Sequence, residues 1–158
     1  MAHWYEHRLP PPLIDAACAA LMWWLARRLP ALQLWPQGAW PLALGAALGL
    51  ALAGGLIALA GVWAFHRART TVNPLAPARA SALVTGGVYR LTRNPMYLGM
   101  LLALLGWAVW LGNAAALLGL PLSVVALGVL QIGPEERILR ARFGEAYVRY
   151  AARVRRWL

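Results

Sequence analysis

The stretch Arg93-Asn94-Pro95-Met96-Tyr97-Leu98-Gly99 opens an apolar run that continues to Ile132 and ends at Gly133-Pro134-Glu135-Glu136. One helical span of a bilayer takes about 20 residues, so this run is long enough to cross a membrane twice. Gly112-Asn113, near its middle, is a pair of turn formers. A tight hairpin returns both of its ends to the same membrane surface. We therefore expect the arginine-rich start and the carboxylate pair to lie together at the rim of the lipid, as polar groups of a site do.

The composition supports a membrane protein. The chain has 158 residues, of which 61% are hydrophobic and 13% are charged, whereas soluble domains are about a quarter charged. All fifteen basic residues are arginine and the formal net charge is +10. These arginines stand in short runs between apolar blocks, where positive charge fixes orientation and contacts anionic lipid headgroups. No nucleic-acid recognition module is recognisable, so we expect membrane lipids rather than nucleic acid as partners.

The spacing of apolar runs predicts an all-α membrane protein with about four transmembrane helices. The first run, residues 13–25, is short for a span and can be extended to residues 11–29 or lie tilted at the interface. The others cover residues 41–65, 95–111 and 114–132. We expect the helix to break at Gly133-Pro134. The small residues Gly45, Gly49 and Ala53 recur every four positions, a spacing that lets another helix approach closely, within the chain or across a dimer.

Two further segments complete the predicted organisation. Residues 70–92 are rich in turn formers and predict a long cytoplasmic loop; loops of this length are usually functional or disordered. Residues 135–158 predict a basic amphipathic helix on the membrane surface or against the hairpin, bent at Gly144. Its apolar face is formed by residues spaced three or four apart: Leu139, Phe143, Tyr147, Tyr150, Val154 and Trp157.

The distribution of arginine predicts the orientation. All arginines except Arg8, Arg27 and Arg28 follow the second span, and positive residues favour the cytoplasmic side. We therefore expect the loop and the amphipathic helix to face the cytoplasm, in the inner membrane of a bacterium. No cleavable signal peptide is recognisable. The single cysteine, Cys18, lies in an apolar run and is expected to serve packing.

The motif residues carry a family resemblance. The strings Gly87-Val88-Tyr89-Arg90 and 93–99, the pair Glu135-Glu136, and Phe143-Gly144-Glu145-Ala146-Tyr147-Val148-Arg149-Tyr150 resemble the isoprenylcysteine carboxyl methyltransferases and the related phospholipid methyltransferases. Thr71-Val72-Asn73-Pro74 and residues 81–85 fit the same pattern. The resemblance covers about residues 70–158 and divides a single domain into N-terminal spans, 1–69, and a catalytic half.

The resemblance implies S-adenosylmethionine as the cofactor, bound on the cytoplasmic side, and a lipophilic substrate that enters from the bilayer. It assigns cofactor binding to ten residues: Gly87, Val88, Tyr89, Arg90, Asn94, Pro95, Tyr97, Leu98, Glu135 and Glu136. It assigns catalytic roles to Arg93, Tyr97 and Glu136. The carboxylates can pair with the donor's ammonium group, tyrosine rings can lie near its sulfonium, and Arg93 can instead orient an anionic acceptor. The family commonly has histidine where this chain has Asn94, which cannot become positively charged.

Each of these elements also has a purely structural explanation when it is taken alone. Arg90 and Arg93 can anchor phosphates, Glu135-Glu136 can be an acidic helix start favoured by the helix dipole, and Tyr97 can be an interface aromatic. Asp15, an ionisable residue within a span, suits a second hypothesis, a non-catalytic membrane subunit or small transporter. A third is a lipid-binding or sensing protein without turnover. No metal site is expected, and the sequence leaves the acceptor and the oligomeric state open.

Overall fold

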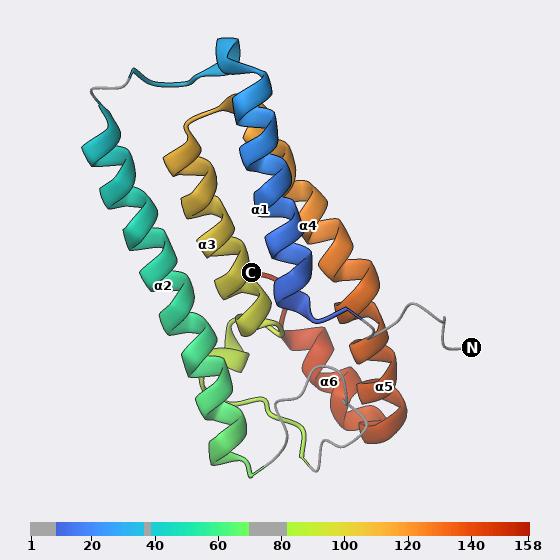
Figure 1. Ribbon diagram of the computed structural model, residues 1–158. Helices are drawn as coiled ribbons and strands as arrows, with labels where there is room; N and C mark the ends of the chain where they lie inside the picture. Colours follow the sequence, from blue (N-terminus) through green and yellow to red (C-terminus); the bar gives the residue numbers. More distant parts are fainter. Residues whose placement is uncertain (1–8, 37–38, 70–81) are drawn as a thin grey trace.

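The computed structural model describes residues 9–36, 39–69 and 82–158, and within these ranges the chain is helical with no strand. The predicted all-α class is therefore confirmed for the described residues. Six α-helices form the scaffold (Figure 1): α1 (Pro11–Arg28), α2 (Trp40–Arg67), α3 (Pro95–Leu111), α4 (Gly119–Leu127), α5 (Gly133–Phe143) and α6 (Glu145–Arg153). Shorter helical turns connect them: η1 (Pro30–Leu32), η4 (Gly87–Arg90), η5 (Ala114–Leu118) and η6 (Gly128–Ile132). Residues 70–81 of the expected loop, with the Thr71–Pro74 motif, lie outside the described part.

Helix α3 has the bounds that the sequence predicts. Pro95 occupies the first turn, where its missing N–H costs nothing and its fixed φ suits a helix. The helix ends at Gly112, which adopts a left-handed conformation with φ of 60°, as glycine does without strain. Asn113 then caps the next helical turn by accepting from the Ala115 N–H at 2.9 Å, and its Nδ2 donates to the Leu29 carbonyl at 2.8 Å. The hairpin turn is thereby fixed to the end of α1.

Helices α2 and α3 approach closely along a face of small residues. A Cβ added to Gly106 would lie 2.6 Å from the Ala47 carbonyl oxygen, and one added to Gly99 would meet the Gly54 carbonyl still more tightly. The backbones are therefore in contact where side chains would normally separate them. Gly45 and Gly49, for which the sequence left packing within the chain or across a dimer open, face open space. The stripe therefore does not form the contact with α3, and packing across a dimer stays a prediction.

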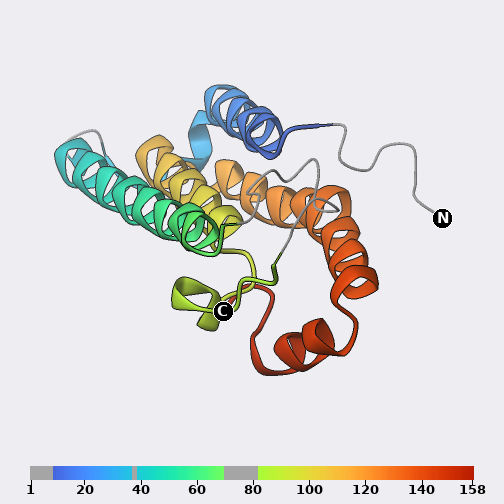
Figure 2. The same cartoon turned by 90° about the horizontal axis from the view of Figure 1, so that it is seen from below.

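At Gly133-Pro134 the sequence predicts a break, with Pro134 able to start the next helix; helix α5 does begin at Gly133 with Pro134 in its first turn, but the helix before it bends into α5 without a gap. The helical path continues from Ala114 to Phe143 and bends at this point (Figure 2). Pro134 has no N–H to donate to the preceding turn, and the wider π-helical turn η6 absorbs this loss, with the Gly133 N–H bonded to the Gly128 carbonyl. The path breaks one helix later, at Gly144, where φ is 50° and ψ is −129°. The amphipathic helix that we expected to bend at Gly144 is divided at this residue into two helices, α5 and α6.

Two helical stretches are long and apolar enough to cross a membrane: α2, and the continuous path from Ala114 to Phe143. Helix α3, with 17 residues, is shorter, and α1 has 18 residues ending in Arg27 and Arg28. The outer face of α2 carries large apolar side chains that no described residue covers: Leu42, Leu48, Leu52, Leu56, Leu59 and Trp63 are each 58% exposed or more. Four full spans are not established by these helices.

The end of the bundle that holds the motif residues is built by several elements together. The last turns of α2, the first turn of α3, η4, α5 and α6 all lie at this end (Figure 1). After α6 the chain extends, since Val154 has φ of −119° and ψ of 128°. Residues 154–158, called here the 154–158 strap, return to the start of α3, where the Arg93 N–H donates to the Arg155 carbonyl at 3.0 Å.

Candidate active site

A 3₁₀ turn presents the first aromatic side chain of the site. Gly87, with φ of 59°, starts η4, and the Tyr89 N–H donates to the Gly86 carbonyl at 3.2 Å. The Tyr89 ring is 5% exposed and meets Phe65 of α2 edge to face, with ring centroids 5.4 Å apart. Its carbonyl accepts the Tyr150 hydroxyl at 2.8 Å. This turn therefore bridges the end of α2 and helix α6.

The same tyrosines are held in their neutral form. Burial raises the pKa of Tyr89 and of Tyr150 well above the ordinary range, since the charged form would lose its hydration. Tyr147, 3% exposed, also has a raised pKa because of burial. These side chains are hydrogen-bond donors and neutral aromatic faces at any pH near 7. Together they line a wall suited to a cation, because the face of an aromatic ring is electron-rich.

Glu136 binds two arginines at once. Its Oε1 accepts from Arg93 Nη2 at 2.9 Å and from Arg156 Nε at 3.1 Å, and its Oε2 accepts from Arg156 Nη2 at 2.6 Å. The Arg156 pair is bidentate, the strongest geometry for a guanidinium and a carboxylate. Hydrogen bonding to Glu136 accordingly raises the pKa of Arg156. Both carboxylate oxygens of Glu136 are thus engaged by the protein itself.

Glu135 has a different environment from its neighbour. Its Oε1 accepts a short hydrogen bond from the Tyr97 hydroxyl, at 2.5 Å, and no arginine contact to it is seen among the described residues. Tyr97 is 4% exposed and packs with Ile14, Leu127 and Ile132. Burying a carboxylate is costly unless a partner of opposite charge is present. Glu135 is therefore the carboxylate of the pair that remains able to receive a cationic group.

Asn94 connects the start of α3 to the 154–158 strap. Its Nδ2 donates to the Arg156 carbonyl at 2.9 Å, and the Thr92 hydroxyl donates to the same carbonyl at 3.2 Å. The Asn94 N–H donates to Thr92 Oγ1 at 3.2 Å. Asn94 stands where the isoprenylcysteine carboxyl methyltransferases commonly have histidine. Its role here is to donate a hydrogen bond to the Arg156 carbonyl, and this role needs no positive charge.

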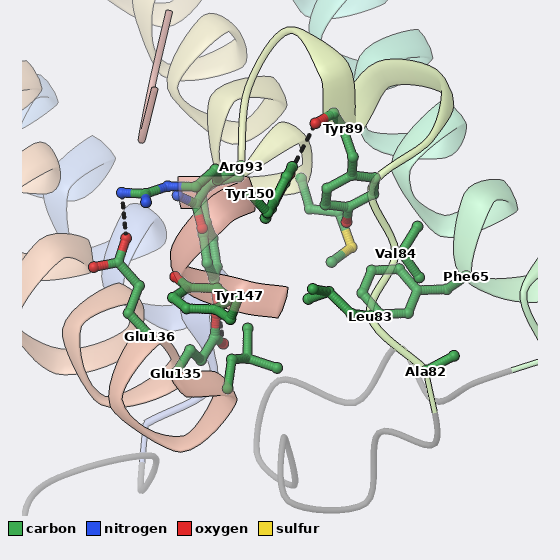
Figure 3. Close-up of a pocket in the computed structure, with 14 residues that line it drawn as sticks. Phe65, Ala82, Leu83, Val84, Tyr89, Arg93, Glu135, Glu136, Tyr147 and Tyr150 are labelled. Carbon is green, nitrogen blue, oxygen red and sulfur yellow. Dashed lines mark hydrogen bonds and ion pairs between the residues drawn. The ribbon is translucent and has the colours of Figure 1, made fainter. Parts of the chain in front are cut away.

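These groups surround one pocket (Figure 3). The charged side chains of Arg93, Glu135 and Glu136 lie on one side of it, and Phe65, Leu83 and Val84 lie on the opposite side. The pocket encloses about 90 Å³, whereas pockets for drug-sized ligands measure about 300–1,000 Å³. Its lining comes from six parts of the chain: Phe65, Ala82, Leu83, Val84, Tyr89, Arg93, Asn94, Met96, Tyr97, Glu135, Glu136, Leu139, Tyr147 and Tyr150. A larger ligand would have to push the lining apart.

Comparison with known proteins supplies the family. The sequence model described as phospholipid methyltransferase matches residues 42–146. The chain belongs to the phospholipid methyltransferase family. An uncharacterized Haemophilus influenzae protein is 48% identical over 63 residues, which cover 40% of this chain and all of that protein. Protein-S-isoprenylcysteine O-methyltransferase B of Arabidopsis thaliana is 39% identical over 79 residues, covering 46% of this chain.

A probable protein-S-isoprenylcysteine O-methyltransferase of Oryza sativa subsp. japonica is 40% identical over 79 residues, again 46% of this chain. The matched region spans 36% of the Arabidopsis protein and 38% of the rice protein. No solved structure matches this chain at comparable significance. The expected resemblance to isoprenylcysteine and phospholipid methyltransferases is confirmed.

The sequence analysis assigned eleven residues to cofactor binding or catalysis. Six of them line the pocket: Tyr89, Arg93, Asn94, Tyr97, Glu135 and Glu136. The others lie around it. Gly87 and Val88 line a neighbouring hollow beside the end of α2, which shares Leu83 and Val84 with the pocket. Pro95 is buried against Gly61, Leu98 is half-buried, and Arg90 is exposed. Their assigned roles in cofactor binding stay predictions.

The sequence analysis missed several residues of this pocket. Leu139, Tyr147 and Tyr150 were placed on one apolar helix face, and the two tyrosines also belong to the family-like string 143–150, but none of the three was assigned to the site. Phe65 and Met96 carried no signal of their own. Arg156 and Thr92 were missed because their contacts depend on the strap returning to α3, which no local pattern predicts. Among the described residues, no group of three or more metal-ligating side chains occurs.

Proposed function

We propose that this chain is an integral membrane enzyme that transfers a methyl group from S-adenosylmethionine to a lipophilic acceptor at the cytoplasmic face. The observation that carries the proposal is the arrangement of a half-buried carboxylate, Glu135, and an arginine, Arg93, around an aromatic pocket in a member of a methyltransferase family. The protein-S-isoprenylcysteine O-methyltransferases of Arabidopsis and rice are 39–40% identical to this chain over nearly half of its length.

The residues present fit the chemistry of that cofactor. It supplies a methyl group already activated on a positively charged sulfonium, so the protein need not create an electrophile. Glu135 offers a negative charge for the donor's ammonium group, and Tyr89, Tyr147 and Tyr150 offer ring faces for the positive charge at sulfur. Arg93 offers a guanidinium to a carboxylate, of the donor or of an anionic acceptor. Glu136 is the less suitable partner for the ammonium, because two arginines already hold it.

The contribution of these side chains is binding, orientation and exclusion of water. Holding two reactants in line lowers the barrier by converting a bimolecular step into a nearly unimolecular one. Phe65, Leu83, Val84 and Leu139 form the apolar part of the lining, which suits a lipophilic acceptor. The acceptor atom can be a carboxylate oxygen, an amine nitrogen or a thiol sulfur, and an isoprenylcysteine-like group, a phospholipid amine and a small hydrophobic molecule are all candidates.

The exposed surface supports membrane insertion. Helix α2 has 28 residues, about 42 Å at 1.5 Å per residue, against a hydrocarbon core of about 30 Å. Arginine–tryptophan pairs mark both ends of the bundle: Arg27 with Trp23 and Arg28 with Trp24 at the end of α1, and Arg67 with Trp63 at the end of α2. Such side chains favour membrane interfaces. We propose four membrane segments in a bacterial inner membrane, with the site facing the cytoplasm.

The membrane-subunit or transporter hypothesis rests on the small-residue stripe of the second span and on Asp15, and the structure gives Asp15 a hydrogen-bond partner. Its carboxylate accepts a hydrogen bond from the Ser123 hydroxyl, joining α1 to α4. Interhelical hydrogen bonds of this kind are common between membrane helices, but this one accounts for only one oxygen of Asp15, since Oδ2 is buried without a hydrogen-bond partner among the described residues. The methyltransferase proposal is the better supported of the two because the family match and the named relatives are methyltransferases.

The proposal is tested by methyl transfer itself. Purified protein in vesicles containing phosphatidylethanolamine, with and without an added farnesylcysteine derivative, is incubated with S-adenosylmethionine labelled in its methyl group. We expect label to enter the lipid-soluble fraction with wild-type protein and not with Glu135→Gln. Equal incorporation by both proteins would remove Glu135 from the site. A wild-type protein that binds no donor and transfers no label would contradict the proposal.

A further inference from the structure

Residues 154–158, which follow helix α6, connect the end of the described chain to the start of α3. The strap leaves α6 at Val154, which has extended backbone angles, and passes the first turn of α3, where its backbone accepts three hydrogen bonds. The Arg93 N–H donates to the Arg155 carbonyl, and Asn94 and Thr92 both donate to the Arg156 carbonyl. Trp157 packs against the buried cluster that includes Tyr97. Each contact joins the strap to a residue that lines the pocket or lies next to one.

The Arg156 side chain adds an ionic clamp to this backbone pairing. It holds both oxygens of Glu136 in a bidentate pair, while Arg93 holds one of them from the other side. Arg93 in turn reaches the Ala151 carbonyl with its Nη1. The rotamer of Glu136 and the direction of the Arg93 guanidinium are thus fixed by α5, α6 and the strap together.

We propose that Arg156 is a positioning residue of the donor site, acting through Glu136 and Arg93; this inference rests on the proposed function. With Arg156 in place, Glu136 is neutralised by the protein and Arg93 is held at the pocket wall. Without it, Glu136 has Arg93 as its remaining ion-pair partner among the contacts seen, and draws the guanidinium away from the ligand. The motifs around Arg93 and Glu135-Glu136 therefore do not contain the whole site, because Arg156 of the strap also belongs to it.

Arg155 offers a matched control for this proposal. It is the neighbouring residue with the same charge, and its side chain is exposed and turns to the Leu158 carbonyl at 3.5 Å. Its contribution to the site is its backbone carbonyl, which Arg155→Gln retains. Replacing either arginine by glutamine removes one positive charge from the strap, so any difference between the two variants measures the clamp rather than the net charge.

The experiment combines two readouts on detergent-solubilised full-length protein. Titration with S-adenosylhomocysteine measures affinity for the donor site, and hydrogen–deuterium exchange measures protection of the Arg93 amide and its neighbours. We expect Arg156→Gln to weaken binding about tenfold and to speed exchange at Arg93. Arg155→Gln should match wild type in both measurements. Arg156→Lys, which restores the charge and one hydrogen bond, should recover most of the affinity.

Several results would overturn the inference. The first is that Arg156→Gln binds S-adenosylhomocysteine and exchanges its Arg93 amide as wild type does. The second is that Arg155→Gln loses as much affinity as Arg156→Gln. The third is that Arg156→Lys binds no better than Arg156→Gln. If Arg156→Gln does not fold, Arg156→Lys is compared with Arg155→Gln instead. The inference then requires Arg156→Lys to bind S-adenosylhomocysteine more weakly than Arg155→Gln does. If wild type itself binds no S-adenosylhomocysteine, the proposed function fails; unchanged exchange in Arg156→Gln would show separately that the clamp positions nothing.

Discussion

Asn94 shows at the scale of one residue how a departure from a family pattern can preserve a role. Its side chain donates one hydrogen bond to the Arg156 carbonyl, and a histidine ring N–H is also a donor. We expect Asn94→Ala to lower the free energy of unfolding by about 1 kcal/mol, because the Arg156 carbonyl loses one of its two donors and keeps the Thr92 hydroxyl. Asn94→His should stay closer to wild type.

The measurement for Asn94 is thermal unfolding in detergent, with Asn94→Ala, Asn94→His and wild type compared side by side. Equal destabilisation by both substitutions would show that the shape of asparagine, and not its donor, is required at this position.

The two adjacent glutamates make a second residue-scale prediction. Glu135 receives only a neutral donor, Tyr97, among the hydrogen bonds seen, so we expect it to face the ligand's cationic group. Glu135→Gln should weaken S-adenosylhomocysteine binding at least tenfold, since a charge-assisted hydrogen bond becomes a neutral one. Glu145→Gln, which removes an exposed carboxylate from the first turn of α6, is the control. A similar loss in both variants would mean that net charge, not position, sets the affinity.

Sequence reasoning predicted the residues of this site that belong to compact motifs. Arg93, Asn94 and Tyr97 lie within one turn of a helix start, and Glu135 and Glu136 share another, so a hairpin suffices to bring them together. Arg156 could not be found in this way. Its contact with Glu136 spans 20 residues, and it depends on the break at Gly144 and on the extended backbone after α6.

At the scale of elements, the contact of α2 with α3 depends on glycines that the regular spacing did not single out. Gly106→Ala would place a Cβ 2.6 Å from the Ala47 carbonyl oxygen, so the helices must separate. We expect a loss of about 1–3 kcal/mol in the free energy of unfolding. Gly49→Ala, where the new Cβ meets open space, should be neutral or stabilising by up to about 1 kcal/mol. Thermal unfolding of the two variants checks this, and a milder effect at Gly106 would argue against close backbone contact.

Helix α6 is connected to η4 by a hydrogen bond whose pH dependence can be derived. Burial raises the pKa of Tyr150, while a tyrosine in the unfolded chain has a pKa of about 10. Above that pH the unfolded state loses its proton and the folded state retains it, so this contribution to stability is present below pH 10 and declines as the pH rises further.

We therefore expect the unfolding temperature of wild type to fall between pH 10 and 11, and Tyr150→Phe to fall less steeply. Tyr150→Phe should also be less stable at neutral pH by about 1 kcal/mol, since the Tyr89 carbonyl loses its donor. A parallel decline in the two proteins would show that Tyr150 is not the group responsible.

The elements themselves were predicted unevenly, for physical reasons. Helix α3 was predicted at both ends because proline starts it and a left-handed glycine stops it. The continuation through Pro134 was not predicted, because a π-helical turn can absorb a missing N–H and sequence alone does not reveal it. The face of α2 that meets α3 was not predicted, because several small residues in α2 satisfy a four-residue spacing and only packing distinguishes between them.

At the scale of the whole molecule, the fold places an aromatic pocket with a charged wall at one end of an apolar bundle. The pocket's enclosed volume of about 90 Å³ is smaller than a nucleoside ligand requires by comparison with ordinary ligand pockets. We therefore expect the segment 82–89 to move when the donor binds. Hydrogen–deuterium exchange of this segment should change on addition of S-adenosylhomocysteine, whereas exchange in the middle of α3 should not. Identical exchange with and without ligand would contradict such an opening.

Calorimetric titration of the solubilised wild-type protein with S-adenosylhomocysteine tests the central claim most directly. We expect saturable binding with one site per chain, weakened at least tenfold in Glu135→Gln and retained in Glu145→Gln. Absence of binding by wild-type protein that keeps its helical fold in the detergent would contradict the proposal that the pocket is a methyl-donor site.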